Sequence, residues 1–190
     1  MKPLFAAVLT SSMLLTGTLA WAGEAVDAAT KAEQLASDGK FSDALLAMDE
    51  AKESIWKATP LTFRKALFVA SDPQGFGIYD IRDSSSFKRS DPLIIYSEPQ
   101  GYGYGRDGDI YVIDLALDFT IKSPDGKVVA EQKNFASLTL RSRVPNKEFM
   151  AKVTYDFSGL PAGDYEVTTA AKDKNSDKSG AFTLKFMLTE

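Results

Sequence analysis

Hydrophobic and polar residues follow two different periods along this chain. In residues 24–58, apolar side chains recur every three or four positions, which is the period of an amphipathic helix. After Thr59-Pro60, apolar and polar residues alternate in several segments, which is the period of a half-buried strand. The pattern therefore predicts a helical N-terminal part followed by a β-rich part.

The helical part divides at Gly39. A stripe of mostly small residues precedes it, made of Ala28, Ala32, Leu35 and Ala36. A stripe with larger members follows it, made of Phe41, Ala44, Leu45, Met48, Ala51 and Ile55. Gly39 suits the position after a helix end, where glycine adopts a left-handed conformation at little cost, and Ser42 or Asp43 can begin the next helix. We expect an antiparallel helix pair with small residues at its contact.

The positions of this pair resemble the core of a single tetratricopeptide-type hairpin, about 35 residues long. The residues that carry the resemblance are Ala32, Ala36, Gly39, Phe41, Ala44, Leu45 and Ala51. The resemblance implies that a lone pair packs against something else, because such repeats bury their faces only by stacking. That can be the β-rich part, or a partner recruited by the acidic outer face, since residues 23–58 hold four basic and eight acidic side chains.

The β-rich part contains three clearly alternating segments, at residues 111–121, 149–157 and 182–188. Residues 61–70 fit either a strand or a short helix after Pro60. Residues 123–127, Ser-Pro-Asp-Gly-Lys, are typical of a tight turn between two strands. We count about eight short strands, at the spacing of an antiparallel two-sheet sandwich.

A second resemblance lies near the C-terminus. Leu160-Pro-Ala-Gly-Asp-Tyr165 is similar to the tyrosine corner of fibronectin-type and other immunoglobulin-like domains, and residues 153–188 resemble the last strands of bacterial secreted immunoglobulin-like modules. The resemblance implies that Tyr165 bonds to backbone near Leu160. The expected fold is mainly β: an immunoglobulin-like antiparallel β-sandwich over residues 59–190, with an N-terminal α-helical hairpin over residues 23–58.

The first 22 residues have the pattern of a secretory signal peptide. Lys2 supplies the positive start, residues 4–19 are apolar and small, and Ala20-Trp21-Ala22 fits a cleavage site before Gly23. We expect a periplasmic or secreted protein with no stable membrane insertion after cleavage. The absence of cysteine favours a bacterial source, because small exported eukaryotic domains usually carry disulfides.

Composition narrows the chemistry. The 190 residues include no histidine and no cysteine, which excludes a thiolate nucleophile, a zinc–thiolate site and a Ser-His-Asp triad. The net charge of −4 disfavours nucleic acid as a partner. Asp173-Lys-Asn175-Ser-Asp177 offers oxygens to calcium but lacks the glycine and the glutamate of a calcium loop. We therefore expect no metal, no cofactor and no enzyme activity.

The unusual feature is rich in aromatic residues and glycine. Its candidate binding residues are Phe76, Tyr79, Tyr102, Tyr104 and Arg106. The rings could form a platform for stacking on sugar or peptide, or they could close one end of the sandwich, and we favour the second interpretation. The sequence thus predicts a non-enzymatic binding or assembly module of the bacterial cell envelope whose partner is another envelope protein. The alternatives are a carbohydrate- or cell-wall-binding domain and, third, a hydrolase that uses two carboxylates.

Overall fold

The structure is a computed structural model that describes the backbone of residues 18–190 and the side chains from residue 23 onward. Most of the predicted signal peptide, residues 1–17, lies outside the described residues. The chain divides into two compact units, one that ends at Ile55 and one that comprises Trp56–Glu190. The second helix crosses this boundary, so its last turn belongs to the second unit.

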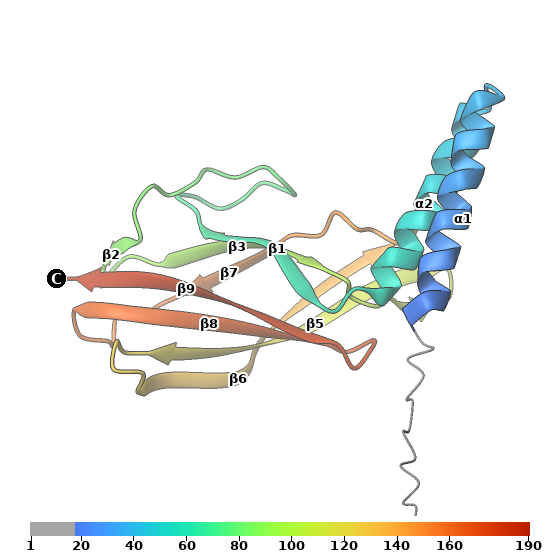
Figure 1. The fold of residues 1–190 in the computed structure, drawn as a ribbon. Coiled ribbons are helices and arrows are strands. Elements are labelled where there is room, and N and C mark those ends of the chain that lie inside the picture. The colour runs from blue at the N-terminus through green and yellow to red at the C-terminus, as the bar shows by residue number, and fades with distance from the viewer. Residues whose placement is uncertain (1–17) are drawn as a thin grey trace, which may run out of the picture. The chain divides into compact units, whose positions relative to one another are not determined.

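The first unit is a helical hairpin of α1 (Thr18–Ser37) and the greater part of α2 (Phe41–Ala58) (Figure 1). Gly39 links the two helices in the left-handed conformation, with a φ of 76°. The amide of Gly39 donates a hydrogen bond to the carbonyl of Ala36, and the amide of Lys40 donates one to the carbonyl of Leu35. These two bonds satisfy carbonyl groups at the end of α1. The antiparallel pair and its glycine turn are as the sequence predicts.

Small side chains fill the contact between the helices. Ala32, Ala44, Ala47 and Ala51 are buried. The large members of the second stripe are not: Phe41, Leu45, Met48 and Ile55 remain exposed. The close approach of two helices over alanine leaves bulky side chains at the rim, because they do not fit between the axes.

The second unit contains nine strands, within the described residues. They are β1 (Thr62–Phe68), β2 (Ser86–Lys88), β3 (Leu93–Gln100), β4 (Gly105–Asp107), β5 (Ile110–Lys122), β6 (Val128–Ser142), β7 (Ala151–Tyr155), β8 (Gly163–Asp173) and β9 (Ser179–Thr189). The three alternating segments of the sequence form β5, β7 and β9, and the ambiguous segment forms β1. The turn between β5 and β6 is closed by the amide of Gly126, which donates to the carbonyl of Ser123.

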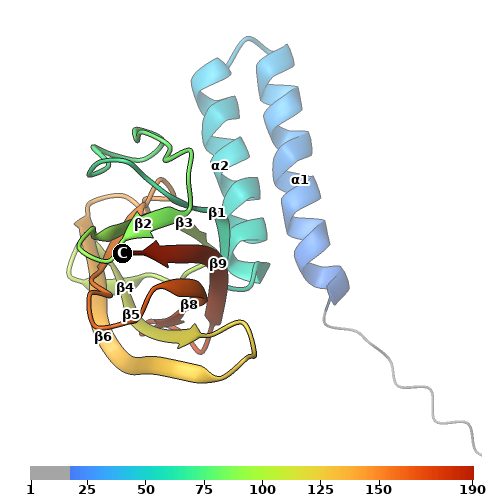
Figure 2. The same ribbon diagram turned by 90° about the vertical axis from the view of Figure 1, so that its left-hand side faces the viewer.

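The strands form two sheets in a sandwich-like arrangement (Figure 2). One sheet has the order β1-β3-β7, and the other has the order β2-β9-β8-β5-β4, with β6 also paired to β5. Their pairs are antiparallel except for β2 and β9, which run parallel over three residues. The sequence did not predict β2, because a strand of three residues leaves no alternating pattern.

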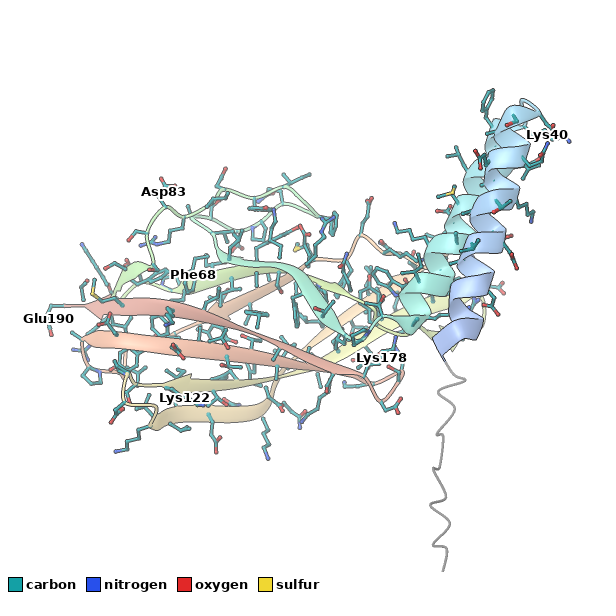
Figure 3. The ribbon with its side chains drawn as sticks, in the orientation of Figure 1. Lys40, Phe68, Asp83, Lys122, Lys178 and Glu190 are labelled. Atoms are coloured by element: carbon teal, nitrogen blue, oxygen red, sulfur yellow. The ribbon has the colours of Figure 1, made fainter. Side chains whose placement is uncertain are left out.

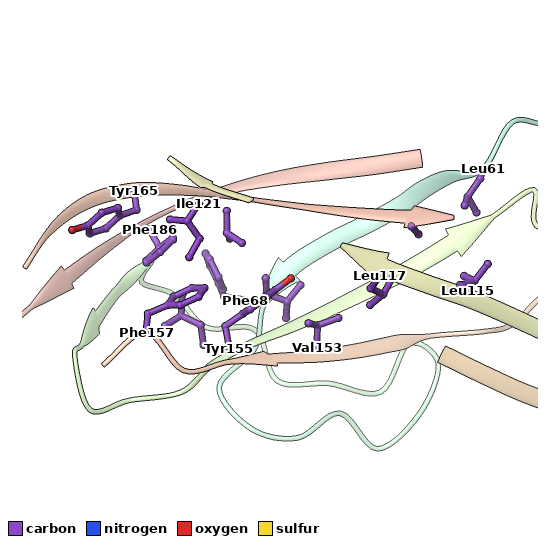
Figure 4. Packing of buried hydrophobic residues seen from close by; sticks show 14 of the residues in the cluster. Leu61, Phe68, Leu115, Leu117, Ile121, Val153, Tyr155, Phe157, Tyr165 and Phe186 are labelled. Carbon is purple, nitrogen blue, oxygen red and sulfur yellow. The ribbon is translucent and has the colours of Figure 1, made fainter. Parts of the chain in front are cut away.

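The core lies between the two sheets (Figure 4). From β5, the side chains of Leu115, Leu117 and Ile121 point into the layer that also receives Val153 and Tyr155 from β7. The Tyr155 hydroxyl shares a hydrogen bond of 2.7 Å with Thr169 Oγ1, so its polar end is satisfied inside the core. Burial raises the pKa of Tyr155 to about 12.

Candidate functional site

The two tyrosines of the glycine-rich segment, Tyr102 and Tyr104, both point toward the backbone carbonyl of Asn146. Tyr102 is 1% exposed, and its ring makes edge-to-face contacts with Trp56, Tyr104 and Phe149 at centroid distances of 4.9, 5.7 and 5.9 Å. The hydroxyls of Tyr102 and Tyr104 both donate to the carbonyl oxygen of Asn146, at 2.9 and 3.0 Å. Burial raises the pKa of Tyr102 well above its ordinary value. A ring so enclosed has no free face for stacking on a ligand, so this geometry favours the sealing interpretation.

The glycines around these tyrosines have a packing reason. Gly101 has a φ of 79°, and a Cβ there would overlap the carbonyl oxygen of Pro60. A Cβ on Gly105 would overlap the side-chain oxygen of Asn175. Backbone at Gly101 and a side chain at Gly105 therefore approach this segment as closely as only glycine permits, and no ligand is needed to explain these two glycines.

The end of β8 and the turn that follows it hold the same segment in place. Asp173 is buried, and its Oδ2 accepts hydrogen bonds from the amide of Gly103 at 2.6 Å and from Ser176 Oγ at 2.5 Å. Lys178, labelled in Figure 3, donates to the carbonyls of Lys57, Thr59 and Gly101. In the part of the chain that the structure describes, no group of three or more acidic side chains is placed to hold a metal ion. The side chains of Asp173 and Lys178, at the two ends of this turn, hold the glycine-rich segment by hydrogen bonds to the backbone of Gly103 and Gly101.

The other candidate residues contact different neighbours. The Tyr79 ring lies 4.1 Å from that of Tyr96, and the Arg64 guanidinium lies over Phe76 at 5.2 Å. Phe76 and Tyr79 belong to the long connection between β1 and β2, residues 69–85. Arg106 lies over the ring of Tyr111 at 3.4 Å. Tyr111 in turn makes an edge-to-face contact with Tyr104 at 5.8 Å, so Tyr102, Tyr104 and Arg106 belong to one cluster, whereas Phe76 and Tyr79 lie apart from it in the connection between β1 and β2.

A buried carboxylate that sequence reasoning missed lies beneath this connection. Glu98 is 2% exposed, and its Oε2 accepts from Arg64 Nε at 2.6 Å and Nη2 at 2.5 Å. Its Oε1 accepts from the Tyr96 hydroxyl at 2.7 Å, and that hydroxyl accepts from the amide of Gly77 at 2.8 Å. Burial raises the pKa of Tyr96 to about 12.

A sequence signal for this cluster does exist. The acid follows the apolar run Leu93–Tyr96 in the same strand, where a buried charge is rare unless it is paired. The contacts of the cluster hold residues 69–85 against β3, and each polar group named here has its partner. The cluster therefore acts as an attachment for the connection.

An open apolar surface lies on the helical hairpin. A groove of about 490 Å³ runs between the helices, lined by Ala29, Ala32, Glu33, Ala36, Phe41, Ala44, Leu45 and Met48. Phe41, Leu45 and Met48 at its rim are 67, 69 and 49% exposed. This groove, called the hairpin groove below, combines large exposed apolar side chains with a floor of alanines, which is the form of a surface that accepts another apolar segment.

Charge sets the two units apart. Residues 23–55 carry three basic and eight acidic side chains, a net charge of −5, whereas residues 56–190 carry eighteen of each sign. The acidic excess of the chain after residue 22 therefore lies entirely on the hairpin. Neither helix within residues 18–190 is long and apolar enough to cross a membrane.

Comparisons with known proteins identify no family for this chain. No family model matches it, and no curated protein matches its sequence. Among solved structures, the sporulation control protein Spo0M from Bacillus subtilis matches with a TM-score of 0.36 and 9% sequence identity, over 70% of this chain and 50% of that one. The matched part thus spans about half the length of that structure.

Proposed function

We propose that this chain is an exported, non-enzymatic binding and assembly module of the bacterial cell envelope. An immunoglobulin-like sandwich provides the scaffold in this proposal, and the helical hairpin provides the docking surface. The tyrosine corner supports the scaffold assignment, because the Tyr165 hydroxyl donates to the carbonyl of Pro161 at 2.9 Å, next to Leu160 as the resemblance implies. The predominantly antiparallel two-sheet arrangement agrees with the same assignment.

Export rests on the signal-peptide pattern of residues 1–22. The mature chain then begins at Gly23, and it works in the periplasm or outside the cell. Mass spectrometry of the exported product tests this part by itself. The expected first residue is Gly23, and recovery of intact Met1 in the membrane fraction would contradict export as a cleaved protein.

The single observation that carries the binding function is the hairpin groove. Burial of a large apolar side chain contributes about 1.5 to 3 kcal/mol. Phe41, Leu45 and Met48 all face water at the groove rim. An apolar segment laid along the groove would cover all three and contact the alanine floor, as an amphipathic helix does in a groove between two helices.

The charge of the hairpin defines the occupant as an amphipathic helix of another exported protein, with basic residues beside its apolar stripe. A net charge of −5 on residues 23–55 attracts such a helix and speeds its association. The same charge opposes pairing of two hairpins from identical chains, and it opposes adsorption to an anionic membrane surface. Glu33 lines the groove itself and is positioned to meet a basic side chain of the occupant.

Neighbouring leucines on α2 provide a matched test. Leu45 lines the groove and Leu46 does not, although the two are 69 and 63% exposed. A photo-crosslinking amino acid placed at either position in the producing cell should capture a partner from position 45 only. The captured segment, made as a peptide, should form an amphipathic helix with basic residues.

Binding of this peptide to the purified protein then decides the proposal. Leu45→Ser should weaken binding at least about tenfold, whereas Leu46→Ser should leave it unchanged. Added salt should also weaken binding, because the interface is charged. Equal effects of the two substitutions, or a captured segment that is acidic or extended, would refute this docking surface.

A further inference from the structure

The larger sheet has a long free edge at β6. This strand runs from Val128 to Ser142 and pairs with β5 along one side, and the strand pairings of the described residues place nothing along its other side (Figure 2). An unpaired edge presents a row of amide and carbonyl groups that can accept another strand. This edge belongs to the second unit and is independent of the hairpin groove.

The first half of β6 carries features that prevent strand addition. Residues 128–134 include Glu131 and Lys133, and Asn134 has a φ of 50°. The pairing with β5 changes register here, between Leu117 and Phe119, which marks a bulge. Charges and bulges are the usual means by which proteins blunt an edge strand.

Six residues of the second half, between Asn134 and Arg141, lack these features. Residues 135–140 read Phe-Ala-Ser-Leu-Thr-Leu, without charge, proline or glycine. Leu138 and Leu140 point to the core side and are only half-buried, whereas Ser137 and Thr139 on the other face are exposed. An uncharged and β-prone segment with incompletely buried leucines is suited to pairing with a further strand.

We propose that this edge pairs with the same edge of a second copy of the chain, antiparallel and centred on Leu138. In that register, Leu138 faces its own equivalent, Ala136 faces Leu140 and Ser137 faces Thr139. The pairs on the core side match apolar with apolar, and those on the outer face place uncharged side chains opposite each other, so no like charges oppose the pairing. The two-fold symmetry is satisfied because each copy contributes the same segment.

The dimer should be weak and reversible. Only about five residues of each chain pair across the edge, so the buried area falls at the low end of protein interfaces. Analytical ultracentrifugation of the purified protein up to about millimolar concentration is the appropriate measurement. A chain that stays monomeric over that whole range overturns the proposal.

Charge substitutions on the outer face test the register. Ser137→Lys with Thr139→Lys places like charges opposite each other twice, and the dissociation constant should rise at least about tenfold. The matched control, Ser137→Lys with Thr139→Glu, places opposite charges there, and it should bind at least as tightly as the unmodified chain. Equal affinity of the two variants overturns the proposal.

The Leu45→Ser variant tests whether the hairpin groove mediates the dimer instead. Persistence of the dimer in this variant shows that the groove does not mediate it, and loss of the dimer overturns the β6 assignment.

A cross-link gives a readout that does not depend on the charged variants. The chain contains no cysteine, so one introduced residue gives an unambiguous disulfide. Leu138→Cys on the proposed two-fold axis should form a covalent dimer on oxidation, because directly opposed Cα atoms lie about 4.5 to 5.5 Å apart. Ala170→Cys, half-buried on β8, which pairs with β5 on one side and β9 on the other at this position, is the control and should remain monomeric. Equal cross-linking at both positions overturns the proposal.

Discussion

The seal formed by Tyr102 makes a quantitative prediction about stability. Tyr102→Ala removes a ring that is 1% exposed and contacts three aromatic neighbours. Truncation of a buried aromatic residue to alanine costs about 3 to 5 kcal/mol, and the loss of the ring pairs places this variant toward the upper end. The free energy of unfolding, measured by urea denaturation, should fall by about that amount.

Phenylalanine substitutions separate the ring from its hydroxyl. Tyr102→Phe and Tyr104→Phe each remove one of the two donors to the Asn146 carbonyl, and each should cost about 1 kcal/mol. The double variant removes both donors to that carbonyl. Its cost should exceed the sum of the single costs, because the second substitution loses the remaining bond to that acceptor.

The same denaturation measurement can refute the assignment of Tyr102 to the core. If Tyr102→Ala lowers the free energy of unfolding by less than about 1 kcal/mol, as a surface substitution would, the ring is not part of the core. Near-ultraviolet circular dichroism should change in the same variant, since Trp56 loses its edge-to-face partner. Strict additivity of the two phenylalanine variants would show that the hydroxyls do not share an acceptor.

Three further predictions concern other polar groups. Arg64→Ala leaves the buried Glu98 carboxylate without its cation and should destabilise the protein more than Glu98→Gln, which removes the charge itself; urea denaturation of both variants checks the order. Tyr165→Phe removes the hydroxyl that donates to Pro161 and should cost about 1 kcal/mol, whereas an unchanged melting curve would contradict the tyrosine corner. The folded-state pKa values of Tyr96 and Tyr155, about 12, lie above the ordinary value of 10.0, so the stabilisation from their neutral forms is complete below pH 10 and declines as the pH rises to about 12. Urea midpoints measured across that range should fall less steeply in Tyr155→Phe than in the unmodified protein.

The sequence by itself determined the features that depend on neighbouring residues. Alternation of side chains identified β5, β7 and β9, because the period of a strand is set by its backbone and is visible in a few residues. Gly39 identified the helix turn, since glycine meets the local backbone requirement there. The hydrogen bond from Tyr165 to nearby backbone, which the resemblance of residues 160–165 implies, is also local, since it spans only four residues.

Only the tertiary structure decided which of these features face each other. Glu98 is paired with Arg64 and Asp173 with the amide of Gly103, across 34 and 70 positions of the chain, and no local pattern encodes such partners. The same holds for Tyr102, whose ring is a platform or a seal according to what covers it, and here Trp56 and Phe149 cover it. The apolar stripe on α2 is a further example. The helical period identifies the apolar face of a helix, but it does not tell which residues of that face another segment buries. Burial is a property of the assembled surfaces, so the hairpin groove and the β6 edge become apparent only once the sheets and helices have formed.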